Sequence, residues 1–138
     1  MIIRTQTQSQ VTWSAAVTKS IPADGVFVES DDFTVDSDMI AIGFSVTGVS
    51  AGSTSNDVLD IHCQVKRDPN NSNSGVPDSY DTSKTFQLSL DCSDGLDNQE
   101  SEILEKVMAG DTIRFVAANN GTNAITIGVQ VTEDTLTF

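Results

Sequence analysis

The sequence has little of the chemistry on which most enzymes depend. Its 138 residues include one His, one Trp and one Tyr. A catalytic serine or cysteine needs a base within hydrogen-bond reach, and His62 supplies the only imidazole. No GxSxG, GxGxxG or GxxxxGK(S/T) motif is present. Paired carboxylates for glycoside hydrolysis usually accompany several Trp and Tyr side chains, which this chain lacks. We therefore expect that the protein is not an enzyme.

Basic residues and long apolar runs are also scarce. Seven Lys and Arg stand against 20 Asp and Glu, for a net charge of −13. Such a surface repels phosphate backbones and anionic lipids, so we expect no nucleic-acid partner. The opening MIIRTQTQSQ has no apolar core of signal-peptide length, and no window approaches a transmembrane span. We expect synthesis in a cytoplasm without a signal peptide, and no membrane insertion.

Only two cysteines are present, Cys63 and Cys92. Each falls on the apolar face of an alternating segment, which favours two buried thiols. A disulfide between neighbouring strands is the alternative, and it would close a loop of about 30 residues. One histidine and the absence of CxxC spacing do not fit a metal pair.

Short alternating segments dominate what is there. In Met39–Val49, Ile40, Ile42, Phe44 and Val46 face one way, while the other face carries small residues that would let another surface lie close. Further strands are expected at Val58–Lys66 and Thr85–Cys92. Many short strands without a long helical pattern predict an all-β fold, an antiparallel β-sandwich of jelly-roll type.

The segment Thr112–Val131 predicts two core strands. Ile113 and Phe115 alternate with polar residues before the turn, and Ile125 to Val131 do so after it. Asn120-Gly121 between them is typical of a tight hairpin connection, so we expect the two strands to pair with each other.

The preceding segment leaves two alternatives open. Ile103, Leu104, Val107 and Met108 recur at helical spacing, and Gly110 would be a sensible helix stop. The same residues also fit the end of a strand that turns into Thr112. We expect at most one short helix, near 98–109.

The polar loop 68–84 is rich in Asn, Ser, Asp and Thr, and is too polar to be buried. A recognition role would use Asn70, Asn71, Asn73 and Tyr80, with the tyrosine stacking on a sugar ring or a partner chain. Further on, Asp91, Asp94 and Asp97 make an oxygen-rich cluster that would suit calcium, but its spacing misses the EF-hand pattern. We expect no cofactor, with calcium at this cluster as the alternative.

The stretch Leu104–Val131, with its AGDTIRF and NNGTNAITIGVQV segments, resembles the small virion proteins of tailed bacteriophages. These include jelly-roll capsid decoration (cement) proteins and the globular domains of fibres. The resemblance implies a homo-oligomer, commonly a trimer, and an N-terminal arm that reaches a neighbouring subunit. In this sequence the arm would include Ile2, Ile3, Val11 and Trp13. The resemblance carries over no functional site residue by residue.

The sequence as a whole predicts an N-terminal arm or first strand at 1–20 and one β-sandwich domain at 21–138. The expected function is that of a non-enzymatic virion component that decorates or stabilises the capsid through contacts with protein subunits of a capsid or fibre. The alternative is a carbohydrate- or receptor-binding module of a virion or cell surface.

Overall fold

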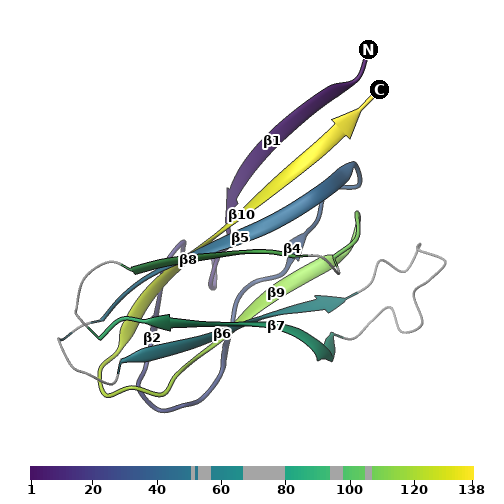
Figure 1. The fold of residues 1–138 in the computed structure, drawn as a ribbon. Coiled ribbons are helices and arrows are strands. Elements are labelled where there is room, and N and C mark those ends of the chain that lie inside the picture. The colour runs from purple at the N-terminus through teal and green to yellow at the C-terminus, as the bar shows by residue number, and fades with distance from the viewer. Residues whose placement is uncertain (51, 53–56, 67–79, 94–97, 105–106) are drawn as a thin grey trace.

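The computed structural model describes residues 1–50, 52, 57–66, 80–93, 98–104 and 107–138. These residues form two antiparallel sheets packed face to face (Figure 1). The strands are β1 (Ile3–Gln10), β2 (Lys19–Ile21), β3 (Val28–Glu29), β4 (Phe33–Thr34), β5 (Met39–Ser50), β6 (Val58–Lys66), β7 (Asp81–Asp91), β8 (Asn98–Ile103), β9 (Thr112–Asn119) and β10 (Ile125–Thr137).

The order of the strands is that of a jelly roll. One sheet, here called the β10 sheet, runs β1-β10-β5-β8, with β2 on the same edge of β10 as β1. The other, the β9 sheet, runs β3-β9-β6-β7, with β4 also on β9. Most strands from β4 onward alternate between the sheets along the chain, as β5 and β6 or β8 and β9 do, whereas β6 and β7 are neighbours in one sheet. The expected all-β jelly-roll sandwich is thereby confirmed.

The core lies between the two sheets and follows from the period of two along each strand. Phe44 of β5 meets Phe115 of β9 across the sandwich, with ring centroids 4.9 Å apart. Above and below this pair the alternating aliphatic residues of β6, β9 and β10 are fully buried. Cys63 and Cys92 are both buried thiols and are not bridged. Burial in this apolar layer raises the pKa of the Cys63 thiol to about 12.

The predicted hairpin at 112–131 is wrong. β9 pairs with β6, β3 and β4, whereas β10 pairs with β5, β1 and β2. The Asn120-Gly121 segment therefore crosses from one sheet to the other. Each strand carries an apolar face in either arrangement, so alternation cannot distinguish a hairpin from a crossover.

The open question at 98–109 is resolved in favour of a strand. Asn98–Ile103 forms β8 and pairs antiparallel with Gly43–Gly48 of β5. Beyond it, Leu104 and Val107 are buried, so their spacing reflects a segment packed against the core. Gly110 has φ of 84° and makes the turn before β9. No helix occurs in the parts of the chain that the structure describes.

The β10 sheet extends beyond the sandwich as a projecting ribbon. Figure 1 shows β1 and the end of β10 running side by side to a common end, with the start of β5 beside them. All but one residue of β1 are exposed. A register shift between Asp134 and Thr135 makes Ile40 the extra residue opposite β10, and its side chain is exposed rather than on the predicted core face.

Candidate functional site

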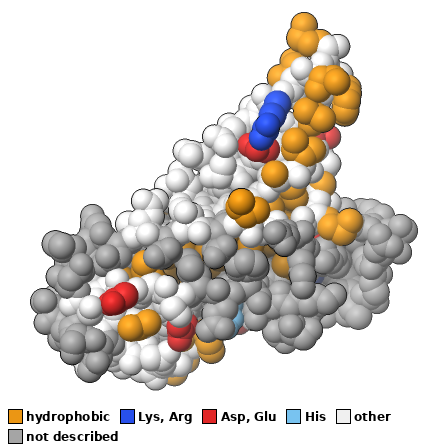
Figure 2. Space-filling model, in the orientation of Figure 1, with side chains coloured by type: hydrophobic (Ala, Val, Ile, Leu, Met, Phe, Trp, Pro, Cys, Tyr) orange, Lys and Arg blue, Asp and Glu red, His pale blue; other side chains and the backbone are white. Residues whose placement is uncertain are grey.

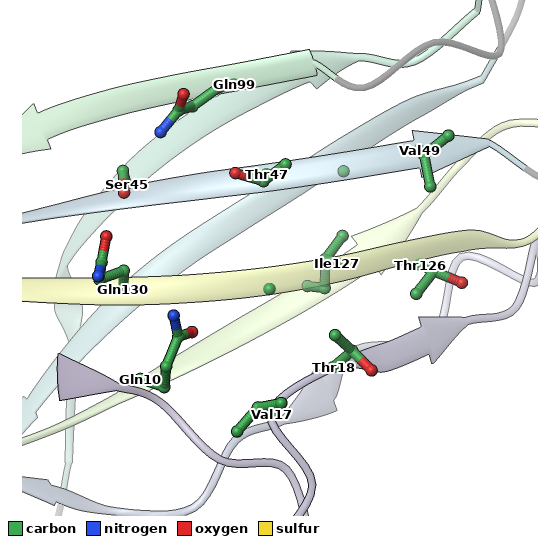
Figure 3. Close-up of a pocket in the computed structure, with 12 residues that line it drawn as sticks. Gln10, Val17, Thr18, Ser45, Thr47, Val49, Gln99, Thr126, Ile127 and Gln130 are labelled. Atoms are coloured by element: carbon green, nitrogen blue, oxygen red, sulfur yellow. The ribbon is translucent and has the colours of Figure 1, made fainter.

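A groove of about 420 Å³ lies on the outer face of the β10 sheet (Figure 3). Its lining comes from β10, β5, β8, the end of β1 and the chain just before β2. The side chains drawn and labelled there are Gln10, Val17, Thr18, Ser45, Thr47, Val49, Gln99, Thr126, Ile127 and Gln130.

The groove exists because small residues meet on this face. Gly128 sits between Thr126 and Gln130 on β10 and presents no side chain. A Cβ at this position would come no closer than 3.6 Å to the nearest atom, the Val17 carbonyl oxygen, so the space above it is open. The neighbouring β5 contributes Ser45 and Thr47, in agreement with the small second face predicted for that strand.

The groove is electrically neutral although the chain carries a net charge of −13. Amide and hydroxyl groups lie in its lining beside the apolar side chains of Val17, Val49 and Ile127, and these polar groups both donate and accept hydrogen bonds. No carboxylate or imidazole is among the lining residues, so the groove offers no acid–base pair. Its chemistry suits an uncharged ligand.

A second surface, the apolar tip, occupies the projecting end of the ribbon. It consists of Met1, Ile2, Ile3, Ile40 and Phe138, which are exposed by 50 to 99%. Figure 2 shows hydrophobic side chains gathered over this end of the molecule. Exposed apolar groups gathered in this way mark contact surfaces more often than scattered ones do.

An ion pair lies just below the tip. The Arg4 guanidinium donates to the Asp134 carboxylate at 2.6 Å and ties β1 to β10. This contact holds the pKa of Asp134 below its usual value.

Of the four residues predicted for the assembly arm, only two are on the surface. Ile2 and Ile3 belong to the apolar tip, whereas Val11 and Trp13 are each 2% exposed and lie in the core. The chain enters the core here because Thr12, Ser14 and Ala15 all donate hydrogen bonds to the Asp31 carboxylate.

Tyr80 packs against the β9 sheet. The Arg114 guanidinium lies 4.0 Å from the centre of its ring and Lys66 lies 5.2 Å from it, while the tyrosine hydroxyl donates to Asp32. Arg114 is itself fixed by Gln64 and Glu29. Desolvation, followed by the neighbouring Asp32, raises the pKa of Tyr80. Its hydroxyl is already engaged within the chain. Asn70, Asn71 and Asn73 lie outside the described residues.

The other candidates for chemistry lie apart from one another. His62 is half-buried, and its ring lies nearly perpendicular to that of Phe27, with the ring centroids 5.4 Å apart. Asp91 accepts a hydrogen bond from the Ser93 amide, and its expected calcium partners Asp94 and Asp97 lie outside the described residues. Among the residues the structure describes, no three His, Cys, Asp or Glu side chains gather as metal ligands.

Sequence reasoning missed a carboxylate with several hydrogen-bond donors around it, Asp57. It is fully buried and accepts hydrogen bonds from Ser50, Thr122 and Asn123. The Ser50 hydroxyl, followed by the amides of the 122–123 crossover, holds its pKa well below the usual value. This residue joins the ends of both sheets and plays no part in the groove. Its place in a Gly/Ser/Asn-rich connection gave no sign of burial.

No family model and no curated protein matches the chain. Solved structures do share its fold. The VP2 subviral particle of infectious bursal disease virus superposes with a TM-score of 0.59 at 11% identity over 96% of this chain. The C-terminal CBM6 of LamC, a marine laminarinase of Zobellia galactanivorans, gives 0.52 at 10% identity, covering 92% of this chain and 99% of the module. Dimeric latent PorU of Porphyromonas gingivalis gives 0.52 at 9% identity, covering 97% of this chain and 13% of PorU.

The chain spans about a third of the VP2 chain, 32% of its length. At these identities the likeness concerns the fold, which occurs both in a virus particle protein and in a carbohydrate-binding module. In the described part of the chain, the structure contains no helix with the length and apolar character needed to cross a membrane.

Proposed function

We propose that this protein is a structural component of a virion, a phage decoration protein that stabilises a capsid by binding its subunits through the apolar tip. The observation that carries the proposal is the concentration of exposed apolar side chains at the end of the projecting ribbon. Burying such side chains stabilises an interface by roughly 25 cal/mol for each Å² removed from water.

The charge distribution supports the same contact region. The first 23 residues contain no Asp or Glu, whereas the rest of the chain carries all 20. β1 can thus approach another surface with little repulsion, because of the two acidic residues beside it on β10, Glu133 is buried and Asp134 is paired with Arg4. A fold shared with VP2 of a subviral particle is compatible with this role.

The test replaces two apolar side chains of the tip with carboxylates. The double variant Ile3→Asp/Ile40→Asp should fold normally, because both side chains are at least half exposed. When it is expressed together with the proteins of a shell that the unchanged protein joins, its co-sedimentation with particles should fall by about tenfold or more.

The matched control is Ile103→Asp. Ile103 is 70% exposed but lies on β8, at the opposite edge of the same sheet. It should incorporate as well as the unchanged protein. Equal incorporation of the tip variant and the unchanged protein would remove the basis for the proposal.

The neutral groove favours a second candidate function, the binding of an uncharged saccharide. Its amide and hydroxyl lining matches the hydrogen-bonding groups of a polyol, and one structure with this fold is a carbohydrate-binding module. The contact would lie at Thr47, Gln99 and Gln130, and not at Tyr80, which is held against the β9 sheet.

A further inference from the structure

The outer edge of β1 is the end of the β10 sheet. β1 pairs with β10 along its whole length, Ile3 to Gln10, and with no other strand in the described part of the chain. The Val11 amide donates to the Val129 carbonyl at 2.9 Å, which continues the same register. In an antiparallel pair, residues whose backbone groups bond to the partner strand alternate with residues whose backbone groups point away from it. Odd-numbered residues of β1 therefore face β10, and the backbone groups of Arg4, Gln6 and Gln8 point to the open edge.

This edge lacks the features that normally prevent strands from pairing between molecules. Natural edge strands are short, or carry charges or prolines. β1 has eight residues, no proline and one charge, Arg4, which is already paired with Asp134. By contrast β8, at the other edge of the same sheet, has Glu100 and Glu102 among its six residues. β1 is the unprotected edge of this sheet.

We propose that β1 pairs antiparallel with β1 of a second copy of this chain, joining two β10 sheets into one across a two-fold axis. The proposal rests on the proposed function in one respect: both place the contact on the projecting ribbon. Here it names the partner as a copy of the same protein.

A second copy fits this edge for two reasons. The strand is self-complementary, because antiparallel pairing about Gln6 sets Arg4 opposite Gln8, and no two like charges meet. Elsewhere two copies with a charge of −13 each repel one another, whereas the first 23 residues contain no acidic residue.

The register limits where the two-fold axis lies. Residues with outward backbone groups must face each other, so even-numbered residues pair with even-numbered ones, and the axis passes through a residue. Gln6 and Thr7 are nearest the middle of β1. A residue on the axis faces its own copy, with Cα atoms about 5.5 Å apart at Gln6 and about 4.5 Å apart at Thr7. Both separations lie within the Cα range of disulfides, so introduced cysteines can form one.

Cross-linking tests this geometry directly. Cys63 and Cys92 are buried, so an added surface cysteine is the accessible thiol. Under mild oxidation Gln6→Cys or Thr7→Cys should give a disulfide-linked dimer as the main product. The control Thr126→Cys, exposed on β10 away from β1, should give no disulfide-linked dimer. If the two β1 variants cross-link no more than this control, the proposal is overturned.

A charge exchange gives a second measurement that does not depend on oxidation. Gln6→Lys alone and Gln6→Glu alone place like charges together and should each be monomeric by sedimentation, whereas their mixture should dimerise about tenfold more tightly than either. An unchanged protein that remains monomeric throughout the micromolar range would overturn the proposal, because β1 would then lack affinity for its own copy.

Failure here is distinguishable from failure of the proposed function. Self-association is measured in the isolated protein, whereas incorporation is measured with shell proteins. If the Gln6 variants lose incorporation while the unchanged protein is monomeric, the partner of β1 is a strand of another protein, and the second-copy proposal is wrong although the virion role stands.

Discussion

Asp57 and Asn123 join the two sheets at one end of the sandwich. The Asn123 backbone amide donates to the Asp57 carboxylate at 3.0 Å, and its side-chain amide donates to the same carboxylate at 3.1 Å. The Ser50 hydroxyl reaches this carboxylate from the end of β5. The polar crossover between β9 and β10 is thereby anchored to the starts and ends of strands in both sheets.

Replacing Asp57 with Asn should destabilise the fold without changing its shape. The amide keeps the volume but has one acceptor oxygen in place of two, so buried donors of the crossover lose their partner. We expect the thermal midpoint to fall by about 5–10 °C. Differential scanning calorimetry measures this. The control Asp38→Asn, at an exposed position, should change the midpoint little. Equal shifts in the two variants would show that Asp57 is not the anchor.

Asp57 and two other carboxylates determine how the stability of the fold depends on pH. Hydrogen bonds to the ionised form lower the pKa of Asp31 and Asp57 from 3.8, and the Arg4 contact does so for Asp134. A lowered folded-state pKa means that the stabilisation is complete above the unfolded pKa and is lost as the pH falls through the folded one. Stability should therefore decline below about pH 4.

Urea unfolding at a series of pH values measures this decline. Between pH 7 and about pH 4 the loss of mutual carboxylate repulsion acts in the opposite direction, so we expect a maximum near the start of the fall. Added salt should flatten the rise, because it screens repulsion between exposed charges. The Asp57→Asn variant should show a shallower fall below about pH 4, and a curve parallel to that of the unchanged protein would contradict the assignment.

The turn after Trp13 predicts a stabilising substitution. Ser14 and Ala15 have φ of 50° and 70°, in the left-handed region that costs residues with a Cβ about 1 kcal/mol or more. Ala15→Gly removes that cost but adds backbone freedom to the unfolded chain, so we expect a net gain of about 0.5 kcal/mol. Chemical denaturation gives the change in the free energy of unfolding. The adjacent Ala16→Gly has no such strain to relieve and should destabilise.

The sequence predicted the strands better than their partners. Alternation identified the inward residues of β9 and β10, including Phe115 and Ile127, because one face of every sandwich strand must be apolar. Pairing depends on contacts distant in sequence, such as those of β10 with β1 and β5. The Asn-Gly pair led to the wrong prediction of a hairpin, because a crossover between sheets needs a tight polar turn as much as a hairpin does. The groove could not be predicted for the same reason, because its residues come from four strands and one connecting segment whose neighbours no local pattern specifies.

Substitution of Gly128 tests whether the groove binds a saccharide. A side chain there projects into the open space, and its Cβ makes only ordinary contact with the Val17 carbonyl. Gly128→Val should fold normally and fill the centre of the groove. Thr132→Val places a valine on the same strand outside the groove lining, and serves as the control.

The probes are neutral hexasaccharides of glucose, galactose, mannose and xylose, titrated into labelled protein and followed by the amide NMR signals. With a saccharide that binds, we expect shifts concentrated at Thr47, Gln99 and Gln130, retained in Thr132→Val and reduced about tenfold in apparent affinity by Gly128→Val. Shifts that centre on Tyr80 instead would place saccharide recognition on the β9 sheet. The absence of any shift with all four sugars would exclude the groove as a site for neutral hexoses and pentoses.

Because no residue of the apolar tip lines the groove, Gly128→Val should leave particle incorporation unchanged. This separates the two candidate functions with one variant.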